Sequence, residues 1–412
     1  MSLVVMKFGG SSVADAEKIK NVASRVVEKR KAGNKVVVVV SAPGDMTDDL
    51  IEMCDKITDS PDDREMDMLL ATGEQVSIAL LSMAIKELNE EAISLTGPQA
   101  GIYVDTAHTK ARIVGIVPTK IQKELLRKKI VIVAGFQGIN PNQDITTLGR
   151  GGSDLSAVAL AAALKADSCE IYTDVDGVYT TDPRVVKDAK KINYISYDDM
   201  LEMAGSGAQI MQARSVEVGK KFGVNIHVRS TFSKANGTII TDEKKIKSWR
   251  KKMEEVVVSA ITFDRNQVKM SVIDLPDRPG IASKIFGELA KNAINVDMII
   301  QSAGQDGYND ISFTVHHSDL KKTLSVLGKV NKTLKAKEII YDDKVAKISI
   351  VGVGMKSHAG VAATMFETLA KQKINIEMIS TSEIKVSCII KVGEINKAAL
   401  ALHKAYGLGK RK

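Results

Sequence analysis

The chain repeats one sequence pattern at a fixed offset of 80 residues. Gly280 matches Gly360, and INVDMI at Ile294–Ile299 matches INIEMI at Ile374–Ile379. Each copy reads as a strand, a glycine turn, an amphipathic helix, a strand, and then a further strand and helix. The pattern therefore predicts two ferredoxin-like βαββαβ units, which are small and should pack together or across a dimer.

The second copy ends in a helix-like segment at Ile395–Tyr406 and has no clear final strand. Val256–Phe263 (VVVSAITF) precedes the first copy and has the β-branched composition of a strand. We predict that this segment supplies the strand that the second copy lacks.

Before the repeat, from Met1 to about Asp242, short β-branched runs alternate with longer helix-like segments. This alternation predicts a largely parallel sheet in a three-layer α/β domain. The runs are VVVVVSAPG, IVIVAGFQG, EIYTDVDG and VNIHVRST. A charged segment, TDEKKIKSWRKKMEE, follows and reads as a linker. We expect domains at 1–243, 256–341 and 342–412 with a linker at 244–255, the strand at 256–263 completing the last domain.

Two glycine-rich turns each stand between a strand-like and a helix-like segment. They are Lys7–Val13 (KFGGSSV) and Thr146–Ala157 (TTLGRGGSDLSA). Glycines let the backbone approach a ligand, and the free N–H groups of a helix N-terminus bind anions. Neither turn has the Walker A spacing, and GRGG is too short for a dinucleotide fingerprint. Either could be a plain turn, but together they favour a bound polyphosphate.

Composition narrows the class of protein. At 412 residues and 44% hydrophobic content the chain can form two or three domains with cores. Lysine and arginine exceed the acids by eight, but the excess is scattered and aromatics make up only 4%. We therefore expect a surface that favours anionic small molecules, and neither nucleic acid nor a membrane as partner. No stretch is expected to approach a membrane span, and the N-terminus lacks a basic leader, so we expect a cytoplasmic protein.

Cysteine and histidine give no sign of a metal site. Cys54, Cys169 and Cys388 lie far apart and form no CxxC pair, so they are interpreted as buried apolar thiols. The six histidines show no ligand spacing, and none is assigned to a metal.

These motifs resemble, over nearly the whole chain, the aspartate kinases of the amino-acid kinase family with tandem C-terminal ACT domains. The landmarks are KFGGSSV, LATGE, GFQG, TLGRGGSD, TDVDGVYTTDPR and QARSVE, followed by the ACT signatures DRPGIA with INVDMIIQ and SHAGVAAT with INIEMISTSE. The resemblance implies a monofunctional enzyme without a fused homoserine dehydrogenase.

The resemblance implies transfer of the γ-phosphoryl group of ATP to the side-chain carboxylate of L-aspartate. The product would be 4-phospho-L-aspartate, in the first step of lysine, threonine and methionine biosynthesis. Because the acceptor is ionised at pH 7, no general base is needed, and catalysis should come from alignment and charge neutralisation. Mg2+ is expected between the phosphates, held mostly by the nucleotide and water.

By resemblance, Lys7 contacts the transferring phosphates, and Asp154 orients Lys7 and the metal-phosphate cluster. Arg150 would clamp a carboxylate of aspartate through its planar guanidinium. The alternatives are a surface lysine, a helix N-cap before Leu155 and a surface arginine, respectively.

Glu74 resembles the residue that holds the α-amino group of the substrate. Its alternative is structural, since Thr72 and Gln75 fit a capping box at a helix start. Ser41, Thr47 and Ser153 would line the substrate pocket, although the first two could equally be turn residues.

The residues that match the nucleotide-binding segments are Lys7, Gly9, Gly10, Ser11, Thr173, Asp174, Tyr179, Asp182, Arg184 and Gln209. Asp174 would lie near the ribose or adenine and Arg184 near phosphate. Gln209 departs from the family, which usually has a cation there, and this loss could weaken ATP binding.

Two sets of residues match positions that hold an amino-acid effector in the ACT pair, expected to be lysine alone or lysine with threonine. They are Asp277, Gly280, Ala282, Asp297 and Gln301 in the first copy, and Met355, Ser357, Asn375, Ile376 and Glu383 in the second. Their structural alternative is a set of turns and strand starts. The ACT domains are also expected to form a homodimer or homotetramer.

Two other functions remain open from the sequence. A kinase for glutamate, N-acetylglutamate or a nucleoside monophosphate would share the fold. A non-catalytic amino-acid sensor would explain Gln209, whereas Lys7, Arg150 and Asp154 argue against it. Met253 could also start a separate regulatory subunit.

Overall fold

The computed structural model describes residues 2–208, 210–249, 257–303, 307–358 and 360–409. Gln209, Val256 and Met253 therefore lie outside the described residues. The described residues form two units: the first lies within Met1–Val178, Lys191–Ala204 and Gln209–Lys252, and the second within Tyr179–Lys190, Gly205–Ala208 and Met253–Lys412. This division differs from the expected boundary at residue 243, because the short segments at 179–190 and 205–208 pack with the C-terminal unit.

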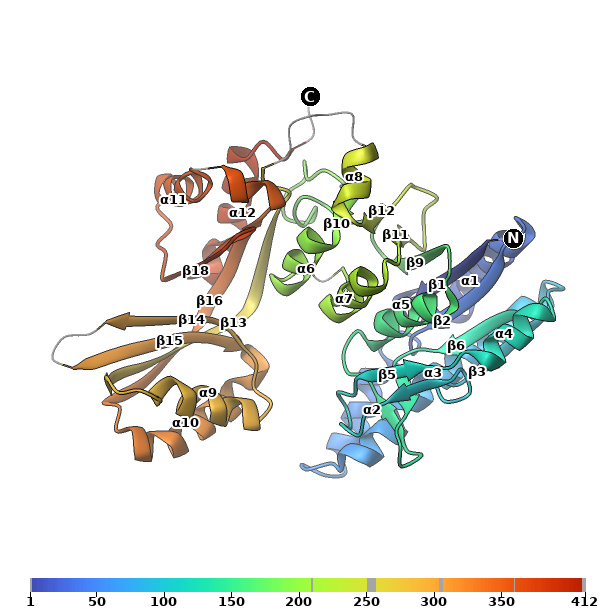
Figure 1. Cartoon of the computed structure of the whole chain (residues 1–412), viewed down its shortest axis with the longest axis horizontal. Helices are drawn as coiled ribbons and strands as arrows, with labels where there is room; N and C mark the ends of the chain where they lie inside the picture. The colour runs from blue at the N-terminus through green and yellow to red at the C-terminus, as the bar shows by residue number, and fades with distance from the viewer. Residues whose placement is uncertain (1, 209, 250–256, 304–306, 359, 410–412) are drawn as a thin grey trace. The chain divides into compact units, whose positions relative to one another are not determined.

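The first unit is built on a sheet whose strands are mostly parallel (Figure 1). Among the described residues, its order is β10-β12-β11-β9-β1-β2-β6-β3, and only the β11–β12 pairing is antiparallel. The strands are β1 (Leu3–Phe8), β2 (Lys35–Val40), β3 (Ala92–Leu95), β6 (Ile130–Ala134), β9 (Ser168–Thr173), β10 (Tyr194–Ser196), β11 (Ile226–Ser230) and β12 (Thr238–Thr241). The predicted largely parallel α/β sheet is confirmed.

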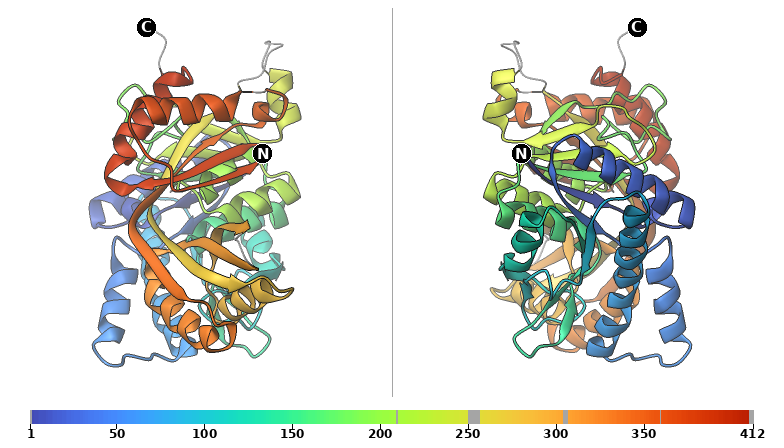
Figure 2. Two further views of the ribbon diagram at one scale, coloured as in Figure 1. Left: turned by 90° about the vertical axis from the view of Figure 1, so that its left-hand side faces the viewer. Right: turned by 90° about the vertical axis from the view of Figure 1, so that its right-hand side faces the viewer.

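Helices cover both faces of this sheet because side chains alternate along each strand. Val4, Met6 and Phe8 of β1 pack into the core formed with α1, while Lys7 points to the opposite face and meets α5. Figure 2 (right) shows α1 lying along the strands. The helices are α1 (Ala16–Lys31), α2 (Met46–Asp55), α3 (Asp63–Glu87), α4 (Thr119–Leu126), α5 (Gly152–Leu164), α6 (Tyr197–Gly205), α7 (Ala213–Phe222) and α8 (Glu243–Trp249), with a 3-10 turn η1 (Gly10–Ser12).

A smaller sheet lies beside α3 and leads into the glycine-rich turn. Its order in the described chain is β5-β4-β7-β8, and β8 packs on α3. The strands are β4 (Ile102–Val104), β5 (Ile113–Ile116), β7 (Gln137–Ile139) and β8 (Ile145–Thr147).

The helix α3 corrects the expectation that no stretch approaches a membrane span. Among the described residues it is the one helix that is long and apolar enough to cross a membrane, and half of its most apolar window is buried in the fold. The sequence reading missed it because Glu74 interrupts an otherwise apolar stretch. Ile78, Leu81 and Ile85 of this helix belong to the core beside α1, as expected for a core helix.

The second unit contains one antiparallel sheet that both repeats share. In the part of the chain that the structure describes, its order is β14-β15-β13-β16-β18-β17. The elements are β13 (Ala260–Pro276), β14 (Val296–Ala303), β15 (Tyr308–His316), β16 (Glu338–Val351), β17 (Met378–Ser382), β18 (Lys385–Lys391), α9 (Ile281–Lys291), α10 (Leu320–Leu334), α11 (Val361–Lys371) and α12 (Ile395–Ala405), with 3-10 turns η2 (His317–Asp319), η3 (Val353–Ser357) and η4 (Val392–Glu394).

The long strand β13 serves both repeats. Its first residues, from Ala260 to Asp264, pair with Lys347–Val351 of β16, next to β18 of the second repeat. Its later residues pair with β15 of the first repeat. The strand begins at Ala260, and 257–259 precede it without forming strand.

The two repeats fold alike down to single backbone angles. Gly280 and Gly360 cap α9 and α11 with φ values of 94° and 92°, a left-handed conformation that favours glycine. Both helices then run for 11 residues. The shared backbone explains why the sequence offset is constant.

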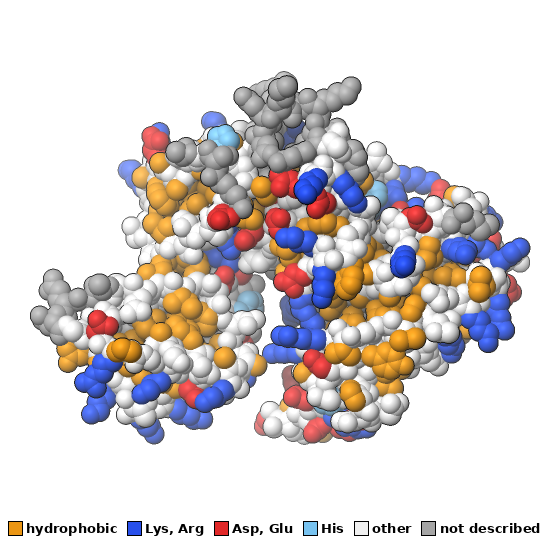
Figure 3. Space-filling model, in the orientation of Figure 1, with side chains coloured by type: hydrophobic (Ala, Val, Ile, Leu, Met, Phe, Trp, Pro, Cys, Tyr) orange, Lys and Arg blue, Asp and Glu red, His pale blue; other side chains and the backbone are white. Residues whose placement is uncertain are grey.

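Exposed lysines gather over α10 (Figure 3), which agrees with the expected cationic, solvated surface.

Among the described residues, two ion pairs cross between the repeats. Asp297 of the first repeat pairs with Lys347 on the first strand of the second repeat. Glu377 occupies the equivalent position of the second repeat and lies 3.2 Å from Nζ of Lys269 on the first strand of the first repeat. The Lys347 side chain is only 2% exposed and also donates to the carbonyl of Gly205 at 3.2 Å. These contacts join the repeats into one unit.

Asp297→Asn should destabilise the second unit, because it leaves the buried Lys347 ammonium without a carboxylate. We expect a loss of about 2 kcal/mol in the free energy of unfolding, below the usual cost of breaking a buried pair since Asp297 is partly exposed. The double variant that also carries Lys347→Met should regain most of the lost free energy of unfolding, because it has no unpaired buried ammonium. Urea unfolding of the two single variants and the double variant measures this coupling, and strictly additive losses would contradict it.

Candidate functional site

The carboxyl ends of the parallel strands bring the loops that follow them to one edge of the first unit's sheet, where ligands of such sheets bind. The loops after β1 and β2 touch backbone to backbone. The N–H of Gly44 donates to the carbonyl of Gly10 at 3.0 Å, and a Cβ at Gly10 would lie 2.8 Å from the carbonyl oxygen of Ala42. Only glycine fits this position, which explains the second glycine of KFGG.

A lysine and a carboxylate meet at this edge. Nζ of Lys7, at the end of β1, lies 2.6 Å from Oδ1 of Asp154 on α5, and both side chains are 11% exposed. Gly9 keeps the space beside them open, since a Cβ there would approach Nζ of Lys7 to 3.4 Å. A buried cation held by one carboxylate beside glycine backbone is suited to bind phosphate.

The second glycine-rich turn leads into α5 as the sequence predicts. Gly149 and Gly151 adopt φ values of 75° and 72°, and Gly151 is the N-cap residue of α5. Asp154 is the third residue of the helix, so the alternative that it caps the helix is wrong. The N-terminus of this apolar, buried helix therefore points its free N–H groups at the loop edge.

Glu74 lies in the middle of α3, which corrects the capping-box alternative. The helix begins at Asp63 and is capped by Asp62, whose side chain accepts hydrogen bonds from the N–H groups of Arg64 and Glu65. Thr72 instead donates its hydroxyl to the carbonyl of Leu69 within the helix. The sequence pattern was misleading because a T-x-x-Q spacing also occurs inside a longer helix.

The environment of Glu74 is unusual for a carboxylate. Its side chain is almost fully buried, Oε1 accepts the N–H of Ala42 at 3.1 Å, and Oε2 has no hydrogen-bond partner among the described residues. Burial raises the pKa of Glu74 to about 7. An orphaned carboxylate oxygen beside the loop after β2 is suited to accept hydrogen bonds from a ligand ammonium group.

The other predicted substrate residues lie on the loops around this pair. Ser41 follows β2, where its carbonyl accepts the hydroxyl of Ser77 from α3 at 2.7 Å. Thr47 lies in the first turn of α2, and Ser153 in the first turn of α5. Arg150 is exposed on the glycine-rich turn.

The predicted nucleotide residues fall into two groups. Thr173 is the last residue of β9 in the first unit and Asp174 follows it, and the carbonyl of Thr173 accepts the N–H of Thr231 at 2.8 Å. Ser11 is exposed in η1 after β1. Tyr179, Asp182 and Arg184 belong to the segment that packs in the second unit, where Arg184 pairs with Asp182 at 2.9 Å.

Sequence reasoning missed one contact at the same edge. The hydroxyls of Ser12 and Thr231 lie 2.6 Å apart in the core of the loop region, which ties η1 to the loop after β11. Thr231 is the last residue of the predicted run VNIHVRST and directly follows β11 in the structure, so its position could have indicated this role.

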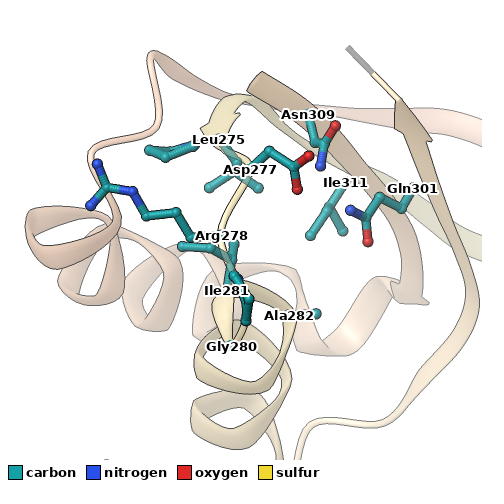
Figure 4. Close-up of a pocket in the computed structure, with 11 residues that line it drawn as sticks. Leu275, Asp277, Arg278, Gly280, Ile281, Ala282, Gln301, Asn309 and Ile311 are labelled. Atoms are coloured by element: carbon teal, nitrogen blue, oxygen red, sulfur yellow. The ribbon is translucent and has the colours of Figure 1, made fainter. Parts of the chain in front are cut away.

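The first predicted effector set surrounds a pocket of about 320 Å³ in the second unit (Figure 4). Asp277, Gly280, Ala282 and Gln301 line it, together with Asn309. Asp297 does not line this pocket, and its carboxylate pairs instead with Lys347. The pocket presents a carboxylate and two amides beside an open helix N-terminus.

The second predicted effector set lies at the equivalent end of the other repeat. Met355 and Ser357 are in η3, although the Ser357 side chain is outside the described residues. Asn375 and Ile376 lie shortly before β17, separated from it by Glu377, and Glu383 lies in the turn between β17 and β18.

The three cysteines are free thiols. Cys169 and Cys388 are buried, as predicted, while Cys54 on α2 is only half-buried, because α2 has no fully buried residue. Among the described residues, no group of three or more metal-ligating side chains comes together.

Comparison with known proteins places the chain in a family. Residues 2–230 match the model of the amino acid kinase family, and residues 271–334 and 348–406 each match an ACT domain model. The chain belongs to the amino acid kinase family and carries two ACT domains. Its full-length relatives include an aspartokinase of Pseudomonas aeruginosa, 50% identical over 408 residues that span 99% of this chain and 98% of the relative.

Solved structures share the fold over the same length. E. coli aspartokinase III in complex with aspartate and ADP matches with a TM-score of 0.82 at 23% identity, covering 98% of this chain and 99% of that chain. The same enzyme in complex with lysine and aspartate matches with a TM-score of 0.75 at 24% identity, with the same coverage.

Glu74 should make the first unit less stable as pH rises. Its folded-state pKa of about 7 lies above the unfolded value of 4.5, so the folded state binds the extra proton between these values. The free energy of unfolding should fall by about 3 kcal/mol from pH 4.5 to above pH 7 through this group. Glu74→Gln removes the titration, so its stability relative to the parent protein should increase with pH. Urea unfolding of both proteins without ligand, from pH 5 to 8, tests this, and a difference that is constant with pH would refute it.

Proposed function

We propose that this protein transfers the γ-phosphoryl group of ATP to the side-chain carboxylate of L-aspartate, giving 4-phospho-L-aspartate. The observation that carries the proposal is the buried Lys7–Asp154 pair at the N-terminus of α5, between two glycine-rich loops. The full-length relative named aspartokinase supports the choice of acceptor, as does the related structure in complex with aspartate and ADP.

The site supplies charge neutralisation and alignment. Lys7 binds the transferring phosphoryl oxygens, and the N–H groups at the start of α5 add partial positive charge. Glu74 accepts hydrogen bonds from the α-ammonium group of aspartate, and Arg150 binds one of its carboxylates. Because the attacking carboxylate is already ionised, no residue has to remove a proton. Asp154 keeps the Lys7 ammonium in place while the nucleotide binds.

We propose that the nucleotide also contacts Gly9, Gly10, Ser11, Thr173 and Asp174. The resemblance assigns Tyr179, Asp182 and Arg184, in the segment 179–190, to nucleotide binding as well. Among the described residues, no group of three or more acidic, histidine or cysteine side chains could hold a metal ion by itself. Asp154, the acidic side chain beside Lys7, could contribute one oxygen ligand. These residues therefore fit an Mg2+ ion that is held mostly by the nucleotide. Bound there, Mg2+ would neutralise phosphate charge between the two anionic reactants.

Further proposals follow from the same resemblance. The protein would catalyse the first step of lysine, threonine and methionine biosynthesis in the cytoplasm, as a homodimer or homotetramer joined through its ACT domains. We propose a catalytic domain at 1–243, a linker at 244–255 and ACT domains at 256–341 and 342–412, with the segments 179–190 and 205–208 docked on the latter.

The purified protein should release ADP in the presence of Mg2+, ATP and aspartate, and not with glutamate as acceptor. Lys7→Met should lower kcat by roughly a hundredfold or more, because a charge-stabilising group at the reacting phosphate is lost. Coupled ADP release measures both.

Lys20→Met is the matched control, since Lys20 lies on the exposed face of α1 and pairs only with Glu17 in the described contacts. Turnover with glutamate but not aspartate would favour another acid kinase. No turnover with either acceptor would overturn the proposal and favour the amino-acid sensor.

We also propose that lysine, or lysine with threonine, inhibits the enzyme by binding at the ACT domains. The pocket at Asp277 offers a carboxylate for an ammonium group and the amides of Gln301 and Asn309 for further hydrogen bonds. The related structure in complex with lysine and aspartate supports lysine as the ligand.

Asp277→Asn should raise the effector concentration for half-inhibition at least about tenfold, because a charged hydrogen bond is lost, while kcat without effector stays unchanged. Lysine and threonine titrations of the ADP assay measure this, with Lys321→Ala on exposed α10 as the control. Wild-type activity that responds to neither amino acid would refute the regulatory proposal.

A further inference from the structure

Asp67 is a fully buried carboxylate in the first unit that the proposed chemistry does not use. It lies on α3, and four polar contacts surround it. Oδ1 accepts the hydroxyl of Thr147 at 2.5 Å, and Oδ2 lies 2.7 Å from Nδ1 of His108. The N–H of Thr109 donates to both oxygens at 3.1 Å. A carboxylate can accept several hydrogen bonds at once, and here they come from two parts of the loop region: His108 with Thr109, and Thr147 at the end of β8.

These contacts hold the glycine-rich turn that carries Arg150. Thr147 ends β8, three residues before Arg150, and its carbonyl accepts the N–H of Ala111 at 2.9 Å. The carbonyl of Thr109 lies against Gly149, where a Cβ would approach it to 3.1 Å. Asp67 therefore fixes both segments that define where the turn begins.

The backbone at Thr109 is strained in a way that needs an anchor. Its φ of 63° is left-handed, which is costly for a β-branched residue. A strained backbone conformation persists only where surrounding contacts hold it in place, and it tends to occur at functional sites. The hydrogen bonds from the Thr109 N–H to Asp67 hold the backbone of Thr109 in this conformation.

The same helix carries Glu74 two turns further along. Glu74 stands seven positions after Asp67, so both side chains lie on the same buried face of α3. Gln137 fixes the helix between them by donating to the carbonyl of Ala71 at 2.9 Å. One rigid helix thus connects the anchor of the Arg150 turn to the carboxylate proposed to bind the substrate ammonium.

We propose that Asp67, with Thr147 and His108, is a positioning group that sets the Arg150 turn relative to Glu74, and so sets the spacing between the two ends of the amino-acid substrate. The inference rests on the proposed function. Among the described contacts the network touches neither Lys7 nor the loops after β9 and β11, so its loss should raise KM for the amino acid more than KM for the nucleotide.

Thr147 offers a sharp test because two substitutions differ only in the hydroxyl. Thr147→Val keeps the shape and removes the donor, whereas Thr147→Ser keeps the donor. We expect Thr147→Val to raise KM for aspartate roughly tenfold, with KM for ATP within about twofold of wild type. Thr147→Ser should keep both values near wild type. Asp67→Asn should raise KM for aspartate further, because an amide cannot accept all the donors that surround it.

The outcomes separate the inference from the proposed function. Wild-type protein without aspartate-dependent turnover refutes the function itself. With an active wild type, an unchanged KM for aspartate in Thr147→Val refutes the positioning role. Equal increases in both KM values, or a lower melting temperature with unchanged kinetics, would also refute it and leave the network a purely structural one. Thermal unfolding of each variant, run alongside the kinetics, makes this distinction.

Discussion

The parallel pairing of β1 with β2 and β9 is the constraint on which the site depends. Parallel strands end at the same edge of a sheet, so Lys7 at the end of β1 comes to lie beside the loops that follow its neighbours. The alternation of side chains then turns Lys7 toward α5 and its neighbours Met6 and Phe8 toward α1. A one-residue shift in this register would bury the lysine in the apolar core and remove Asp154 from its reach.

Helix α3 supplies the second fixed element. It places two buried carboxylates on one face, and each meets a different loop: Glu74 accepts from Ala42 after β2, and Asp67 accepts from Thr147 at the end of β8. Burying a carboxylate is costly unless hydrogen bonds compensate it. Both oxygens of Asp67 have hydrogen-bond partners, whereas Glu74 keeps one oxygen without a partner among the described residues and has its pKa raised to about 7. Asp67 is therefore suited to hold the surrounding loops in place, and Glu74 is suited to bind a ligand.

Local patterns predicted much of this fold, because they depend on residues that are close in sequence. The 80-residue repeat places the starts of α9 and α11 correctly, and the glycines of the second turn predict the start of α5. The position of Glu74 was misjudged, since the helix start depends on Asp62, twelve residues earlier. The Asp67 network was not foreseen, because its partners lie 41 to 80 residues away in the sequence and only the packed helix brings them together.

The two repeats show how a duplicated fold acquires unequal sites. Asp297 and Glu377 are equivalent in sequence, yet the lysines that pair with them are not: Lys347 corresponds to Gln267 in the first repeat, so the lysine of that repeat stands two residues further along, at 269. As a result Asp297 meets a buried ammonium, whereas Glu377 is shared between two lysines nearer the surface. A ligand ammonium at either carboxylate would have to displace a lysine that is already bound. Asp277 lines an open pocket, which makes it the better acceptor for an amino-acid effector.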